Sequence, residues 1–341
     1  MDQSNFFHHF VFKTSLFLLS FFFIVVSCEE KRQIGFYHDH YFDPDFFKTL
    51  KEHLHFECEL FFSSTVENLF YKTRQDAFLV FFNFDLKGAK ALIENKKPAI
   101  EILMEPKTVK KPFYHLSLLR CFRYVLTFDD DLVDNKSFHK FFYPVYFPNE
   151  SFDYHQKTQL SCMLNANKFS KHEGELYSER RKIIDYFKDS KSFSLYGQSW
   201  SSKLACYKGI AKSKEDVLKK SLFTFCLENS KDQKGYITEK IFDCFRYGSI
   251  PIYFGPSNID EYIPKGCYVD YSKFLSLDAL FKFMQKFNDE DYALYMANIL
   301  IFLESEKAKR FKPENLPIKV AELLNKMHLE ARSLPIHELV E

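Results

Sequence analysis

Short apolar runs alternate with amphipathic stretches along residues 33–128. The apolar runs predict strands at Gln33–Tyr37, Phe56–Phe62, Asp76–Asn83, Pro98–Met104 and Tyr124–Phe128. Phe46–His55 and Leu86–Glu94 predict helices between them. The run Asp76–Asn83 is continuous, which is typical of a central parallel strand with both faces covered. Strands that alternate with helices over this length predict a doubly wound α/β lobe.

A second alternating unit lies between residues 220 and 270. Apolar runs bounded by Asn, Ser, Asp, Gly and Pro predict two strands, at Leu222–Leu227 and Ile250–Phe254. A helix is predicted between them, from Thr238, which can cap it, to about Tyr247, with Gly248 just past its end. This order predicts two parallel strands joined by a right-handed crossover.

Polar residues cluster where the first of these strands ends and the helix begins. They are Glu228, Asn229, Tyr236, Glu239 and Lys240. Ligands of open α/β sheets bind beyond the carboxyl ends of the strands, and a helix N-terminus there favours an anion. The pattern therefore predicts a site for an anionic ligand such as a diphosphate.

The chain also carries blocks with a characteristic spacing. They are Phe223–Ser230, Tyr236–Lys240 and Gly248–Asn258, with Asn165–Lys168, Leu176–Arg181, Tyr196-Gly197 and Tyr207–Gly209 upstream. Over roughly residues 95–275 these blocks resemble the α-1,3/1,4-fucosyltransferases, glycosyltransferase family 10. The resemblance implies an α/β fold of GT-B type, in which two Rossmann-like doubly wound lobes face each other across a cleft.

The resemblance further implies a reaction. The family transfers L-fucose from GDP-fucose to a GlcNAc-containing oligosaccharide, inverting the anomeric centre in a single displacement. GDP-fucose would be the donor substrate, the oligosaccharide the acceptor, and no cofactor is expected. Two alternatives stay open: a transferase with another nucleotide sugar or acceptor hydroxyl, and a non-catalytic nucleotide- or glycan-binding relative. Intact Tyr236, Glu239 and Lys240 argue against the last alternative.

The departing diphosphate of such a donor needs positive charge. Lys240 is the predicted partner, Glu239 is expected to hold sugar or ribose hydroxyls, and Tyr236 to pack on or hydrogen-bond the nucleotide sugar. Glu228 and Asn229 are expected to orient the loop. Each assignment has an alternative without a role in binding. Lys240 would then be a solvated lysine, Glu239 a first-turn acid favoured by the helix dipole, and Tyr236 an ordinary loop aromatic.

The resemblance implies a second cation on the diphosphate, N-terminal to the block that ends in Glu228-Asn229-Ser230 (ENS). Lys203 and Lys208 are the candidates, and Lys208 fits the pattern better. Its alternative is a surface lysine.

The acceptor hydroxyl needs a general base. Glu105 ends the apolar run Pro98–Met104, where a carboxylate could face the cleft with its pKa raised by apolar neighbours. The family places an acceptor-side Glu after such a strand, so Glu105 is the predicted catalytic base and Glu101 the second choice. The alternative for Glu105 is a strand-terminal acid before a Pro turn.

Two patterns offer metal ligands. Asp129-Asp130-Asp131 contains a D-x-D triplet, and His38-Asp39-His40 could present two imidazoles on one face of a strand. The aspartates follow a strand, so an Asx-turn or a helix cap is the expected role. No third ligand accompanies the histidines, and we expect a metal-independent site.

Residues 15–27 form a membrane-like stretch. It is shorter than the roughly 20 apolar residues of a spanning helix and suits a signal-peptide core or a short signal anchor. Val25–Cys28 also resembles a bacterial lipoprotein cleavage box. We expect membrane attachment through about residues 10–27, in a Golgi-type membrane if the source is eukaryotic and in the inner or cell membrane if it is bacterial.

Net charge and cysteine spacing indicate which partners and metal sites are not expected. The net charge is +1, which does not indicate a nucleic-acid partner. The eight cysteines contain no CxxC pair, so a zinc cluster is not expected. Cys226 and Cys244 lie within apolar runs and are predicted to be buried thiols, which favours a reducing compartment.

The chain is predicted to have four parts. They are a signal or anchor segment (1–30), an acceptor-side α/β lobe (31–150), a donor-binding lobe (151–305) and a C-terminal helical tail (306–341).

Overall fold

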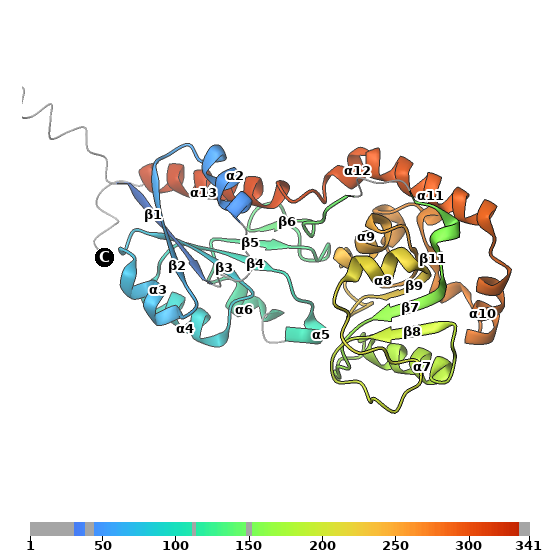
Figure 1. Cartoon of the computed structure of the whole chain (residues 1–341). Helices are drawn as coiled ribbons and strands as arrows, with labels where there is room; N and C mark the ends of the chain where they lie inside the picture. The colour runs from blue at the N-terminus through green and yellow to red at the C-terminus, as the bar shows by residue number, and fades with distance from the viewer. Residues whose placement is uncertain (1–30, 38–43, 111–113, 148–151, 334–341) are drawn as a thin grey trace, which may run out of the picture.

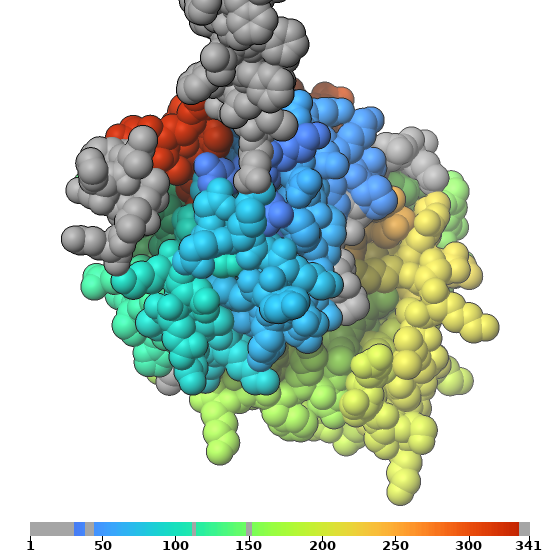
Figure 2. Space-filling view, turned by 90° about the vertical axis from the view of Figure 1, so that its left-hand side faces the viewer, coloured from blue at the N-terminus to red at the C-terminus, as the bar shows by residue number. Residues whose placement is uncertain are grey.

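Two parallel β-sheets organise the computed structural model, which describes residues 31–37, 44–110, 114–147 and 152–333. Each sheet forms the centre of one lobe, and the two lobes lie side by side (Figure 1). Figure 2 views the first lobe from the front, with parts of the second lobe extending past it. Both lobes combine parallel strands with covering helices, so the predicted α/β fold class is confirmed.

The first lobe contains a six-stranded sheet in the order β2-β1-β3-β4-β5-β6. Its strands are β1 (Arg32–Tyr37), β2 (Cys58–Ser63), β3 (Phe78–Phe82), β4 (Ala99–Leu103), β5 (Tyr124–Thr127) and β6 (Phe138–Lys140). Its helices are α2 (Pro44–His53), α3 (Val66–Lys72), α4 (Leu86–Asn95), α5 (Lys107–Lys110) and α6 (Leu116–Leu119). Every residue of β3 and β4 is buried, as expected of central strands covered on both faces.

The second lobe contains a five-stranded sheet in the order β11-β10-β9-β7-β8. Its strands are β7 (Gln159–Leu164), β8 (Phe193–Tyr196), β9 (Ser221–Leu227), β10 (Ile250–Phe254) and β11 (Val269–Asp270). Its helices are α7 (Tyr177–Phe187), α8 (Lys214–Lys220), α9 (Glu239–Arg246), α10 (Leu277–Lys286), α11 (Asp289–Glu304) and α12 (Glu306–Lys309). Short 3-10 turns occupy Tyr154–Gln156, Ile259–Glu261, Lys265–Cys267 and Tyr271–Lys273.

The β9–α9–β10 unit matches the prediction for residues 220–254. Ile250 pairs with Phe223 and Phe254 with Leu227 in a parallel register. The apolar face of α9 is buried on this sheet, and Gly248 ends the helix with a φ of 68°. That left-handed conformation suits a glycine, because it has no Cβ.

The last described helix, α13 (Asn315–Ser333), leaves the second lobe and packs on the first (Figure 1). Val320 and Leu324 belong to the core that lies under β1, β3 and β4. Asn325 accepts the N–H of His55 at 2.8 Å and donates to the carbonyl of His53 at 2.9 Å. Part of the predicted tail is therefore a buried element of the first lobe.

Several predictions fall on residues that the structure does not describe. The membrane-like stretch within residues 10–27 and the His38–His40 pattern lie outside the described residues. Within the described ranges, every helix is too short or too polar to cross a lipid bilayer. The seven cysteines of this part are free thiols, and Cys226 and Cys244 are buried, as predicted.

Candidate functional site

A cavity of about 290 Å³ lies at the carboxyl end of β9, lined also by the segment after β7 and by α8 and α9. The strand order reverses between β7 and β9. The chain goes from β7 to its outer neighbour β8 on one side, and from β9 to its outer neighbour β10 on the other. Ligands of doubly wound sheets bind at such switch points. The charged lining residues are Lys168, Arg180, Lys214, Glu239, Lys240 and Asp243, so four cations face two acids and favour an anionic ligand.

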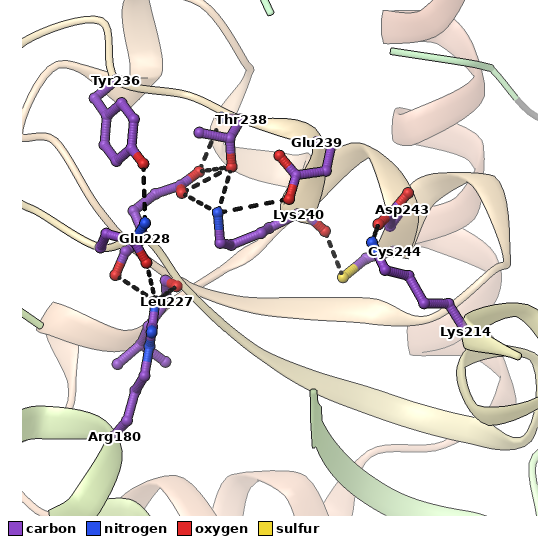
Figure 3. Close-up of polar contacts among 11 residues, drawn as sticks. Arg180, Lys214, Leu227, Glu228, Tyr236, Thr238, Glu239, Lys240, Asp243 and Cys244 are labelled. Atoms are coloured by element: carbon purple, nitrogen blue, oxygen red, sulfur yellow. Dashed lines mark hydrogen bonds and ion pairs between the residues drawn. The ribbon is translucent and has the colours of Figure 1, made fainter. Parts of the chain in front are cut away.

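Lys240 lies in the first turn of α9 and lines the cavity. Its Nζ donates to Glu228 Oε2 at 3.1 Å and to Thr238 Oγ1 at 2.7 Å, and Glu239 Oε1 lies 3.7 Å away (Figure 3). Burial disfavours the charge on Lys240, but Glu228 and Glu239 outweigh burial and raise its pKa. The side chain is therefore held as a cation in the cavity wall.

Glu228 follows β9 and is fully buried. Its carboxylate accepts the Thr238 N–H at 2.9 Å and the Thr238 hydroxyl at 2.9 and 3.1 Å, in addition to the Lys240 ammonium. Thr238 is the N-cap residue of α9, as predicted, but its hydroxyl makes no capping hydrogen bond. Thr238 instead joins the buried carboxylate to the lysine of the first turn.

Glu239 points from the same turn and also lines the cavity. Burial acts to raise the pKa of its carboxyl, but Lys240 and Lys214 together lower it below the ordinary value. Lys214, from the start of α8, donates to Asp243 at 2.8 Å. An ionised Glu239 can accept hydrogen bonds from sugar hydroxyls, as its predicted role requires.

Arg180 of α7 is a cation of this cavity that sequence reasoning did not select. Its Nη2 donates to the carbonyls of Leu227 and Glu228 at 2.6 and 2.8 Å and to Asn229 Oδ1 at 3.0 Å. The residue is 3% exposed, and its Nε has no hydrogen-bond partner within the described ranges. Arg180 belongs to the block Leu176–Arg181 that resembles the family, and this could have identified it from the sequence. The predicted candidates, Lys203 and Lys208, lie more than 20 residues further along the chain.

The two lysines predicted as that second cation lie elsewhere. Lys203 and Lys208 are exposed, and neither lines the cavity. Lys208 contacts the carbonyl of Ala205 at 3.5 Å, which is typical of a surface lysine. Arg180 and Lys168 occupy the place that the prediction gave to Lys208.

Tyr236 lies in the core rather than in the cavity. Its ring is 2% exposed and packs on Phe128 and Tyr143 of the first lobe, with centroids 4.8 and 6.0 Å apart. Its hydroxyl accepts a hydrogen bond from Asn229 Nδ2 at 3.2 Å. The ring therefore joins the lobes and has no open face on which a nucleotide sugar could pack.

Glu105 lies two residues beyond β4, in the first lobe. Burial raises the pKa of its carboxyl, and Lys240, Lys168 and Lys110 offset only part of this shift. Two of these cations, Lys240 and Lys168, line the cavity of the second lobe, and their charges lower the pKa of the Glu105 carboxyl. The Lys240 charge therefore acts on the Glu105 carboxyl although the two residues belong to different lobes.

Glu101, the second choice for the base, is fully buried within β4. Its carboxyl accepts the Phe84 N–H at 3.2 Å, and burial raises its pKa well above the ordinary value. Asn83, which follows β3, accepts the N–H groups of Met104 and Glu105 at 2.8 and 2.9 Å. Glu101 thus lies beneath the strand end that carries Glu105.

The three aspartates after β5 contact protein groups. The Asp131 N–H donates to Asp129 Oδ1 at 3.2 Å, as expected for an Asx-turn. Asp130 pairs with Lys140 at 2.7 Å, and Asp131 pairs with Lys234 of the second lobe at 2.9 Å. Within the described ranges, no group of three or more acidic, His or Cys side chains is arranged to hold a metal ion.

Comparison with known proteins gives the same assignment for the second lobe. Residues 154–308 match the family model "Glycosyltransferase family 10 (fucosyltransferase) C-term". This match begins later and ends later than the predicted range of resemblance, 95–275. The chain is 37% identical over 71 residues to an α-(1,4)-fucosyltransferase of Arabidopsis thaliana. The aligned residues make up 21% of this chain and 18% of the relative.

A second relative is the 4-galactosyl-N-acetylglucosaminide 3-alpha-L-fucosyltransferase 9 of Mus musculus. It is 28% identical over 149 residues, which is 43% of this chain and 38% of the relative. The matches therefore span less than two fifths of the lengths of both relatives.

The fold extends beyond these alignments. The crystal structure of an α1,3-fucosyltransferase superposes with a TM-score of 0.55 at 14% identity, covering 89% of this chain and 92% of that one. The likeness establishes the GT-B arrangement of both lobes, as predicted. Residues 154–308, which include Glu228–Ser230 (ENS) and Tyr236–Lys240 (YITEK), are thus similar to glycosyltransferase family 10, the fucosyltransferases. Glu239 and Lys240 of the second block line the cationic cavity.

Proposed function

We propose that this protein transfers L-fucose from GDP-fucose to a GlcNAc-containing glycan, forming an α-1,3 linkage with inversion. The observation that carries the proposal is the cationic cavity at the switch point, whose Lys240 and Lys168 lower the pKa of the Glu105 carboxyl in the other lobe. The family 10 match supports the reaction class. A solved α1,3-fucosyltransferase with GDP shares the fold, which supports the choice of donor.

In this proposal the diphosphate binds between Lys240 and Arg180. Lys240 contributes a cation held at the start of α9. The Nε–H of buried Arg180, which has no partner in the described part of the chain, can donate to a phosphate oxygen. Charged donors make the stronger hydrogen bonds to phosphate. Glu239, ionised in the same cavity, accepts hydrogen bonds from sugar or ribose hydroxyls.

The transfer is a single displacement. The Glu105 carboxylate takes the proton of the acceptor hydroxyl while the acceptor oxygen forms a bond to the anomeric carbon. The bond from that carbon to the β-phosphate oxygen breaks on the opposite face, and GDP leaves with the electron pair. Lys240 and Arg180 stabilise the charge that develops on GDP.

Activity without added metal is the expected result. Side-chain cations in the cavity can neutralise the departing diphosphate, so the step does not require a divalent ion. We expect product formation to persist in EDTA. If EDTA abolishes transfer and Mg²⁺ or Mn²⁺ restores it, the Asp129–Asp131 triplet must be re-examined as a metal site.

The decisive experiment is a product assay on protein that lacks residues 1–30. GDP-fucose and N-acetyllactosamine are supplied, and GDP-mannose and UDP-galactose serve as control donors. Fucosylated product with α-1,3 linkage and inverted configuration supports the proposal. Transfer from a control donor instead identifies a different transferase, whereas GDP binding without transfer or donor hydrolysis identifies a non-catalytic relative.

A further inference from the structure

The donor-side loop between β9 and α9 is tied directly to the first lobe by one buried amide. Gln233 lies in this loop, three residues before Tyr236, and is 1% exposed. Its Nε2 donates to Asp129 Oδ2 at 2.9 Å, and its Oε1 accepts the backbone N–H of Lys107 at 2.6 Å. Both partners belong to the first lobe, so a single side chain bridges the two lobes.

One partner of Gln233 lies close to the predicted base in the chain. Lys107 begins α5 and lies two residues after Glu105. The Tyr114 hydroxyl donates to the Glu105 carbonyl at 3.0 Å. On the other side of this turn, the side-chain carbonyl oxygen of Asn83 holds the Glu105 N–H. Asn83 therefore holds the Glu105 N–H from within the same lobe, and Gln233 holds the Lys107 N–H, two residues further along the chain, from the donor lobe.

The bridge requires an amide. One end must accept the Lys107 N–H and the other must donate to the Asp129 carboxylate, and an amide group supplies both functions. A carboxylate at position 233 would place two negative oxygens face to face in a buried site. An apolar side chain there would leave the Lys107 N–H and Asp129 without these partners.

We propose that Gln233 is a positioning residue, which sets the Glu105 carboxylate at its working distance from the donor bound at Lys240. The inference rests on the proposed function. The same loop runs from Gln233 into the first turn of α9, so a shift of the bridge changes the spacing between base and donor. Small displacements of this kind lower the rate of the chemical step more than they weaken binding.

A separate set of contacts keeps the lobes together when this bridge is lost. Asp130 accepts hydrogen bonds from Tyr262 at 2.6 Å and from Asn258 at 2.9 Å, and Asn258 accepts the N–H of Gly235 at 3.0 Å. Lys140 also reaches Tyr262, at 2.9 Å. Substitution at Gln233 is therefore expected to leave the two-lobed fold intact.

The test is an exchange of the bridge partners, Gln233→Glu and Asp129→Asn, singly and together. Gln233→Glu should lower kcat by about 10- to 100-fold while KM for GDP-fucose and Kd for GDP change little. Asp129→Asn should have a small effect, because Gln233 can still donate to the new side-chain carbonyl. The double variant should recover most of the lost kcat. In that variant the amide introduced at position 129 can donate to the carboxylate at position 233, which still accepts the Lys107 N–H.

The outcomes separate this inference from the proposed function. If wild-type protein makes no fucosylated product, the proposed function and this inference both fail. If wild-type protein is active and Gln233→Glu keeps its full kcat, the positioning role alone is overturned. Loss of GDP binding in Gln233→Glu, or no recovery in a double variant whose melting temperature matches wild type, also overturns it.

Discussion

Lys240 is the residue on which donor binding is expected to depend most. Its ammonium is held by Glu228 and Thr238 in the wall of the cavity. A charge-assisted contact to phosphate contributes about 1.5–3 kcal/mol, so Lys240→Ala should weaken GDP binding by about 10- to 150-fold. Isothermal titration calorimetry with GDP measures the change. Lys208→Ala is the matched control, because Lys208 is an exposed lysine outside the cavity, and similar affinities in the two variants would contradict the assignment.

Glu105 is expected to act in the chemical step and not in donor binding. Glu105→Gln keeps the size of the side chain and removes its basicity, so kcat should fall by about 10²- to 10⁴-fold with Kd for GDP unchanged. Glu101→Gln is the matched control, because Glu101 is buried within the preceding strand. Steady-state kinetics on both variants decide between the two carboxylates. A greater loss of kcat in Glu101→Gln would move the base to β4.

The pKa of Glu105 predicts a pH dependence. Burial raises this pKa above the ordinary value of 4.5, and a general base must be ionised to accept a proton. The value of kcat/KM should therefore fall as pH decreases through the raised pKa. Lys110→Gln removes one of the cations that lower this pKa, so the acidic limb should shift to higher pH. A limb that stays in place in this variant would argue against Glu105 as the titrating group.

The raised pKa of Glu105 also affects the free energy of unfolding. Because the pKa is higher in the folded protein than in the unfolded chain, the folded state binds more protons between the two values. The free energy of unfolding contributed by this group therefore decreases as pH rises from the unfolded to the folded pKa. Glu105→Gln should flatten this part of the stability–pH curve, which urea unfolding at several pH values would show.

At the scale of secondary-structure elements, α13 is expected to stabilise the first lobe. Leu324 is fully buried in the core beneath that lobe's sheet, whereas Leu329 of the same helix is 67% exposed. Leu324→Ala should lower the free energy of unfolding by about 2–5 kcal/mol, as large-to-small core substitutions do. Leu329→Ala should change it little. Equal effects in urea denaturation would show that α13 does not pack on the first lobe.

The strand at β9 and the helix at α9 illustrate what local pattern can predict. Apolar runs and terminal glycines fixed β10 at Ile250–Phe254 and placed the end of α9 before Gly248, because these signals act within a few residues. Thr238 is the N-cap residue of α9, as predicted, but a tertiary contact prevents its side chain from capping the helix. Glu228, fully buried beneath the loop, takes the hydroxyl that a cap would use.

At the scale of the whole molecule, attachment to a membrane is a proposal that rests on residues 10–27. Full-length protein should sediment with membranes after lysis, because this stretch can insert its apolar side chains into lipid. Protein that lacks residues 1–30 should appear in the supernatant with unchanged kcat. Recovery of both forms in the supernatant would contradict the proposal.

The sequence alone determined the fold class and the kinds of side chain at the carboxyl ends of the strands. Alternating strands and helices specify α/β lobes, and the ENS and YITEK blocks place Glu239 and Lys240 at a helix start beside a strand end. Glu105 could also be selected, because a carboxylate directly after a buried strand must lie at the same edge of its sheet. The structure places these three residues at the predicted strand and helix ends, because each position depends on neighbours in the chain.

Only the tertiary structure decided which distant groups share the site. Arg180 on α7 reaches the cavity of α9, and Lys208 does not, because the paths of the connecting segments set these positions. Tyr236 lies in the aromatic core of the opposite lobe, and Gln233 meets Asp129 and the turn after Glu105 across the lobe boundary. Contacts between residues so far apart in the chain depend on how two finished lobes dock, and no local pattern in the chain encodes that geometry.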